Sequence, residues 1–101
     1  MKYLIITAVK AFEKEIKAIL KKATVNEYTY KDVTGYRDFS ELSINDNWFA
    51  NEMNEGESIF FYSFVQNEQV DKVFELVTKF NNKQKSMSTI HVAVLNIEKS
   101  I

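Results

Sequence analysis

Apolar residues form two strand-like segments in which both odd and even positions are hydrophobic. Residues 2–9 (KYLIITAV) and residues 57–65 (ESIFFYSFV) have this pattern, which is typical of strands covered on both faces. The second segment places two sets of side chains on opposite faces: Ile59, Phe61 and Val65 on one, and Phe60, Tyr62 and Phe64 on the other. Both segments are therefore predicted to be central strands of a sheet.

Two other segments follow the helical period. In residues 11–23 acidic side chains come early and lysines late, which matches the helix dipole. The apolar stripe of this helix consists of Phe12, Ile16, Ile19, Leu20 and Ala23. Asn67 is the predicted N-cap of a second helix over residues 68–80. The apolar stripe of this second helix consists of Val70, Val73, Phe74, Val77 and Phe80.

Residues 25–36 and 88–97 complete the pattern as two further strands. The order βαββαβ indicates an α+β fold, the ferredoxin-like plait, with a four-stranded antiparallel sheet and two helices on one face. We expect a single domain over residues 1–101. One segment falls outside this scheme: a polar excursion at about residues 36–56, too long for a hairpin turn.

The predicted fold leaves one face of the sheet without helices. Phe60, Tyr62 and Phe64 would lie on that face and expose several hundred Å² of apolar surface, which a soluble monomer rarely tolerates. We therefore expect this face to be the interface of a homo-oligomer.

Composition narrows the class of protein. The 101 residues carry a net charge of −1, with 46% hydrophobic and 27% charged residues. This balance does not indicate nucleic-acid binding. No run of residues is long and apolar enough for membrane insertion, and the chain has no cysteine. We expect a cytoplasmic protein.

Several segments together resemble the PII signal-transduction proteins and the related CutA-type trimers. The segment IITAVKAFEKEIKAIL is similar to the first strand and helix of that family, and VTGYR is similar to the end of its second strand. The segment ESIFFYSFVQNEQVDKVFELVTKF is similar to the third strand and second helix. The resemblance spans residues 3–97 in the correct order and implies a homotrimer.

The resemblance identifies the excursion with the T-loop, which in that family contacts a membrane transporter or an enzyme. Aromatic and apolar anchors in a polar segment suit such a contact. The candidate contact residues are Tyr36, Phe39, Trp48, Phe49 and Met53. The alternative is that Trp48 and Phe49 pack back onto their own trimer.

The resemblance also implies a ligand site between subunits. Residues 81–91 (NNKQKSMSTIH) lack the glycines of the family's phosphate-binding loop, so the nucleotide-binding loop is degenerate and the ligand or cofactor stays unknown. The candidate ligand-binding residues are Lys10, Gly35, Arg37, Lys83 and Lys85.

No pattern of catalytic residues is evident, and we expect a protein that is not an enzyme. The function predicted is that of a PII-like regulator. The alternative is a CutA-like protein that binds divalent metals, with the single histidine, His91, as a ligand. A third interpretation is a dimeric plait resembling antibiotic-biosynthesis monooxygenases.

Overall fold

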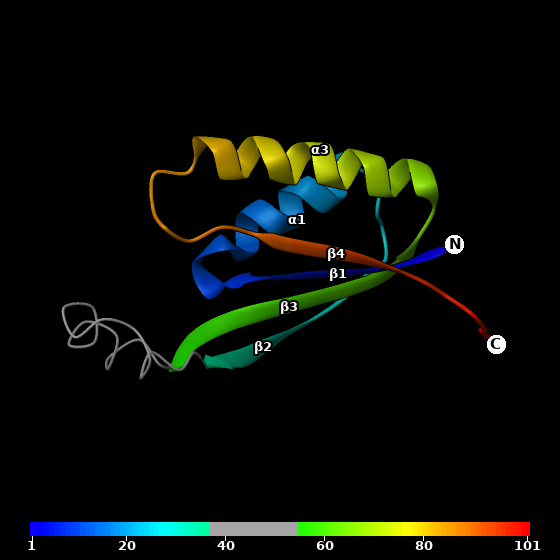
Figure 1. Ribbon diagram of the computed structural model, residues 1–101, viewed down its shortest axis with the longest axis horizontal. Helices are drawn as coiled ribbons and strands as arrows, with labels where there is room; N and C mark the ends of the chain where they lie inside the picture. Colours follow the sequence, from blue (N-terminus) through cyan, green and yellow to red (C-terminus); the bar gives the residue numbers. More distant parts are fainter. Residues whose placement is uncertain (37–54) are drawn as a thin grey trace.

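The computed structural model describes residues 1–36 and 55–101. The chain order is β1 (Lys2–Val9), a 3₁₀ turn η1 (Lys10–Phe12), α1 (Glu13–Lys22), β2 (Thr29–Tyr36), β3 (Glu55–Val65), α3 (Asn67–Lys83) and β4 (His91–Asn96). The four strands form one antiparallel sheet in the order β2-β3-β1-β4. Both helices lie on the same side of this sheet (Figure 1). The predicted ferredoxin-like fold is therefore confirmed.

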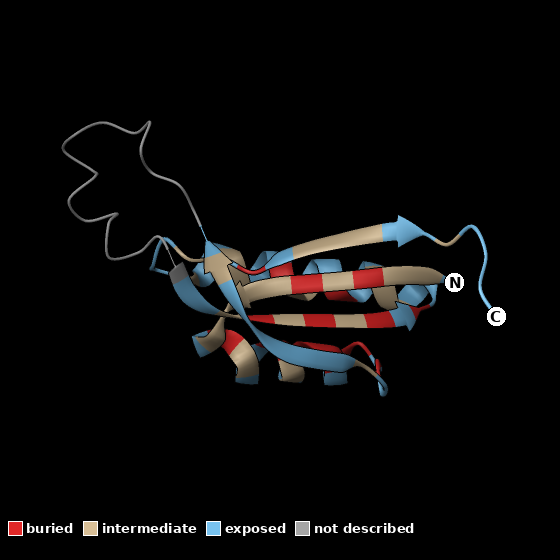
Figure 2. Ribbon diagram, turned by 90° about the horizontal axis from the view of Figure 1, so that it is seen from below, coloured by how far each residue is buried: buried red, intermediate tan, exposed pale blue. Residues whose placement is uncertain are grey.

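Alternation along the central strands separates the two faces of the sheet. Leu4 and Ile6 of β1, and Ile59 and Phe61 of β3, face the helices and are at most 1% exposed. Seen from below, β1 and β3 show buried and half-buried residues in alternation (Figure 2). The predicted central position of these two strands is confirmed, because β3 pairs with β1 and β2, and β1 pairs with β3 and β4.

The apolar stripe of the first helix is confirmed. All five of its predicted residues are buried: Phe12, Ile16, Ile19, Leu20 and Ala23. After α1, Thr24 adopts a left-handed backbone conformation, with φ 60°. The amide of Val25 then bonds to the Leu20 carbonyl at 2.9 Å. Val25 is therefore buried at the helix end, and β2 begins at Thr29 instead of at the predicted residue 25.

The N-cap and the buried face of the second helix differ from the sequence prediction. The N-cap of α3 is Gln66, not Asn67, and its amide donates to Gln69 Oε1 at 2.7 Å. Phe74 is 41% exposed, whereas Leu76, outside the predicted stripe, packs against the core. The helix face that meets the sheet is thus turned from the Phe74 side toward the Leu76 side.

The connection from α3 to β4 is held by one side chain. Asn81 Nδ2 donates to the Ile90 carbonyl at 2.9 Å, and the Ile90 amide donates to Asn81 Oδ1 at 2.8 Å. Ile90 is 3% exposed. The backbone amide and carbonyl of Ile90 bond to the Asn81 side chain rather than to a neighbouring strand. β4 accordingly begins at His91 and not at the predicted residue 88.

Candidate functional site

The strand ladder closes the base of the predicted excursion. The register of β2 and β3 ends with Gly35 opposite Gly56 and Tyr36 opposite Glu55. A Cβ atom built on Gly35 would lie 2.8 Å from Ser58 Oγ, so the glycine allows Ser58 to approach the backbone closely. The end of β2 and the beginning of β3, which flank residues 37–54 in the chain, lie at one end of the molecule (Figure 1).

The same end of the molecule collects most of the predicted ligand residues. Lys10 follows β1, Gly35 lies near the end of β2, and Lys83 ends α3, with Lys85 two residues further on. In Figure 1 the ends of β1, β2 and α3 lie at the end of the molecule opposite to both chain termini. Lys10 contacts Asp32 and Glu13, and among the described residues no side chain bridges Lys10 to Lys83 or Lys85. Arg37 lies outside the described residues.

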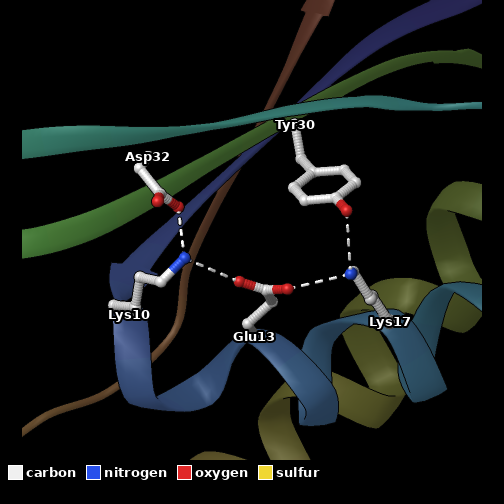
Figure 3. Close-up of polar contacts among 5 residues, drawn as sticks. All are labelled: Lys10, Glu13, Lys17, Tyr30 and Asp32. Carbon is white, nitrogen blue, oxygen red and sulfur yellow. Dashed lines mark hydrogen bonds and ion pairs between the residues drawn. The ribbon is translucent and has the colours of Figure 1, made fainter.

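Lys10 is held by two carboxylates that the sequence analysis did not assign to a site. Its Nζ donates to Asp32 Oδ1 of β2 at 2.5 Å and to Glu13 Oε1 of α1 at 3.0 Å (Figure 3). The contact with Asp32, and then that with Glu13, raises the pKa of the Lys10 ammonium. An anionic ligand at Lys10 would therefore share the ammonium with two carboxylates or replace one of them.

The network continues from Glu13 along α1 to the sheet. Lys17 Nζ donates to Glu13 Oε2 at 2.8 Å and to the Tyr30 hydroxyl of β2 at 3.0 Å (Figure 3). The same nitrogen lies 4.2 Å from the centroid of the Tyr30 ring. Lys17, followed by Lys10, holds the pKa of the Glu13 carboxyl below its ordinary value, while Glu13 and Tyr30 raise the pKa of Lys17. The network links edge strand β2 to the beginning of α1.

The register of β2 explains why this network forms. In β2 the positions that pair with Phe61 and Ile59 are Tyr30 and Asp32. Paired residues of an antiparallel ladder project to the same face, and Phe61 and Ile59 are buried under the helices. Asp32 is therefore a carboxylate on the helix-covered face of an edge strand, and Lys10, which directly follows β1 two places away in the sheet, supplies its cation.

Beside Lys10 lies an open cleft of about 430 Å³. It is lined by Lys10, Lys31, Asp32, Val33, Thr34, Glu57 and Ser58. The register places Asp32, Thr34 and Glu57 on the helix-covered face, in the row of Ile59. All of these lining residues except Val33 have polar or charged side chains, and the cleft lies directly before the base of the excursion.

The uncovered face of the sheet carries the predicted interface residues. Phe60 and Tyr62 are half-buried within the single chain, and Phe64 is 55% exposed. Tyr3 of β1 joins them, with its ring 5.7 Å from that of Tyr62 and 5.3 Å from that of Phe64, centroid to centroid. These four aromatic residues, called here the aromatic strip, follow the two central strands.

The structure describes His91 and Tyr36 but not the other predicted contact residues. His91 is exposed on edge strand β4, opposite Thr7. Among the described residues, no three His, Cys, Asp or Glu side chains gather in a way that could hold a metal ion. Tyr36 is 67% exposed. The other predicted contact residues, Phe39, Trp48, Phe49 and Met53, lie outside the described residues.

The fold resembles that of a PII-like protein of known structure. One solved structure that matches is that of CPII, a nitrogen regulatory PII-like protein from Thiomonas intermedia K12, bound to ADP, AMP and bicarbonate. It is similar over 99% of this chain and 94% of the CPII chain, with a TM-score of 0.62 and 18% sequence identity. The resemblance to PII-like proteins is thus confirmed at the level of the fold.

The comparisons by sequence found no relatives. No protein-family model matches the chain, and no curated protein matches it. Within the described residues, no helix is long and apolar enough to cross a membrane.

Proposed function

We propose that this protein is a PII-like regulator that binds a small ligand and contacts a transporter or an enzyme through residues 36–55. The observation that carries the proposal is the fold, shared along nearly the whole chain with a nitrogen regulatory protein that was solved with ligands bound. A cleft lined mostly by polar and charged side chains lies beside the base of the excursion. Its position supports the proposal that ligand binding affects contact with the partner. The proposed role is binding, not catalysis.

Assembly as a homotrimer is part of this proposal, and the aromatic strip supports it. Phe64 and Leu95 of the uncovered face are 55% and 46% exposed in the single chain. Burying apolar surface of this kind contributes about 25 cal/mol per Å² before the costs of association. A second and a third copy of the chain would cover the strip and bring further side chains to the cleft.

The ligand-binding part rests on the end of the molecule at which Lys10, Gly35, Lys83 and Lys85 are found. The segment between α3 and β4 contains no glycine, and its side chains bond to one another, as in the contact of 2.9 Å between Gln84 Nε2 and Ser86 Oγ. Such a segment is a poor cradle for a polyphosphate, because close backbone approach to phosphates favours glycine. The proposed ligand is therefore small.

Deletion of residues 39–54 tests the role of the excursion. The proposal predicts that the deletion variant keeps the sedimentation coefficient of an assembled trimer and loses its partner. The partner would first be identified by crosslinking in the host cell and then purified for a direct binding measurement with both forms. A matched control replaces the same residues with a Gly/Ser segment of equal length.

Two results would contradict the proposal. Loss of assembly in the deletion variant would show that the excursion is structural. Unchanged affinity for the purified partner would show that the contact surface lies elsewhere.

A further inference from the structure

The cleft beside Lys10 combines charges of both signs. On the helix-covered face it presents the ammonium of Lys10, the carboxylates of Asp32 and Glu57, and the hydroxyl of Thr34. Its volume of about 430 Å³ falls within the range of roughly 300–1,000 Å³ that is common for small-molecule sites. The charges of the lining therefore restrict the chemistry of a ligand more than the size of the cleft does.

A simple anion is a poor match to these charges. Lys10 already contacts Asp32 and Glu13, so an incoming phosphate or carboxylate would either replace one of them or gather a third anion around one ammonium, which has three N–H donors. Asp32 is the partner that can leave, because its side chain is 63% exposed, against 26% for Glu13. The displaced Asp32 would then lie beside the anion and Glu57, and like charges in one site repel. Lys31, the other cation of the lining, is paired with Phe60 and projects to the opposite face of the sheet.

A small zwitterion avoids this cost. Its carboxylate takes the place of Asp32 on Lys10, and its ammonium pairs with the released Asp32, so that Lys10 and Asp32 each keep a partner of opposite sign. Glu57 and Thr34, which are paired with each other across the ladder, offer further acceptors for the ammonium. The exchange leaves the net charge of the cleft unchanged.

We propose that the cleft binds a free amino acid, with its carboxylate on Lys10 and its ammonium on Asp32. This inference rests on the proposed function only in taking the cleft as the ligand site. Binding opens the direct Lys10–Asp32 contact. Asp32 lies four residues before the end of β2, so the ligand distinguishes two states of the strand that leads into residues 37–54.

The test is calorimetric titration of the full chain with each of the twenty amino acids, and in parallel with inorganic phosphate, bicarbonate, AMP and ADP. For any amino acid that binds, its N-acetyl and its amide derivatives are titrated as well, because each lacks one of the two charges. The proposal predicts that an amino acid binds and that both derivatives bind at least roughly tenfold more weakly, as expected for loss of a charged hydrogen bond.

Two variants separate a zwitterion from a simple anion. Lys10→Met removes the cation in either case. Asp32→Asn weakens binding of a zwitterion roughly tenfold, whereas it strengthens binding of an anion, since the competing carboxylate is gone. The matched control is Glu75→Gln on α3, whose carboxylate also contacts two lysines, Lys72 and Lys79, outside the cleft.

Each outcome decides the proposal. Weaker amino-acid binding in Lys10→Met and Asp32→Asn, with Glu75→Gln unchanged and faster amide exchange in Thr29–Tyr36 when ligand is added, supports it. Phosphate, bicarbonate, AMP or ADP binding that strengthens in Asp32→Asn overturns it in favour of a simple anion. Absence of amino-acid binding at millimolar concentration also overturns it, while the trimer and partner measurements still decide the proposed function separately.

Discussion

The two faces of the sheet are built from the same strands but differ in how far one chain completes them. On the helix-covered face, Ile59 and Phe61 of β3 are at most 1% exposed. On the uncovered face, their neighbours Phe60 and Tyr62 are half-buried and Phe64 is 55% exposed. The helix-covered face is a complete hydrophobic core within one chain. The uncovered face is rich in aromatic residues but has no second layer packed on it within the chain. Hydrophobicity alone therefore does not say which apolar residues stabilise the single chain.

The largest expected effect separates the two faces within one strand. Phe61→Ala should destabilise the chain by about 3–5 kcal/mol, because it empties a fully enclosed site. Phe60→Ala, one residue away on the uncovered face, should cost much less in dilute protein. Urea unfolding at a low and a high protein concentration measures both variants. If the two substitutions cost the same at the lowest concentration, the single chain does not distinguish the faces as described.

The next effect concerns assembly through the aromatic strip. Phe64→Asp should weaken self-association by about 2 kcal/mol or more, because it places a charge within the proposed interface. Phe74→Asp is the matched control, since Phe74 is an exposed aromatic residue on α3, on the other side of the sheet. Sedimentation velocity of both variants and the parent chain gives the result. Dissociation by both variants, or by neither, would contradict the assignment of the interface to the strip.

A smaller effect is expected where a side chain joins the helix layer to the edge of the sheet. Asn81→Ala removes both hydrogen bonds to the Ile90 backbone and should cost about 1–2 kcal/mol. Asn82→Ala, at the next and exposed position of α3, should change the free energy of unfolding little. The difference between the two urea midpoints is the measurement, and equal midpoints would show that water replaces Asn81 without loss.

The smallest effect is electrostatic and depends on pH. The pKa of Glu13 is lowered by Lys17 and Lys10, so its contribution to stability is complete above the ordinary value of 4.5 and is lost as the pH falls through the lowered pKa. Glu13→Gln should flatten this part of the stability profile, and high salt should reduce the difference, because these side chains are partly exposed. Urea midpoints measured from about pH 5 to about pH 3 test the sign. A loss of stability that grows as pH rises would contradict it.

The sequence predictions that the structure confirms are those that rest on local patterns of apolar residues. The alternation in β1 and β3 identified the central strands, and the stripe from Phe12 to Ala23 identified the buried side of α1. Phe74 was assigned to the core wrongly, because a stripe with apolar residues on both flanks does not say which flank meets the sheet. Predictions for Arg37, Phe39 and the other excursion residues remain predictions.

In the candidate site, too, the sequence identified single residues but not the contacts between them. Lys10 was selected from the sequence by resemblance, as a residue near a ligand, whereas its partner Asp32 lies 22 positions further along the chain. Nothing in the local pattern around either residue joins them. Their contact arises because the end of β1 turns into η1 beside an edge strand whose register places Asp32 over the helix-covered face.

The amino-acid sequence by itself determined the order of strands and helices, the two apolar faces of the central strands and the length of the excursion, because these depend on residue spacing along the chain. Only the tertiary structure decided that Lys10 lies between Asp32 and Glu13, that Leu76 and not Phe74 meets the core, and that Asn81 holds Ile90. These contacts depend on strand register and helix rotation, which are set by packing between segments far apart in the chain.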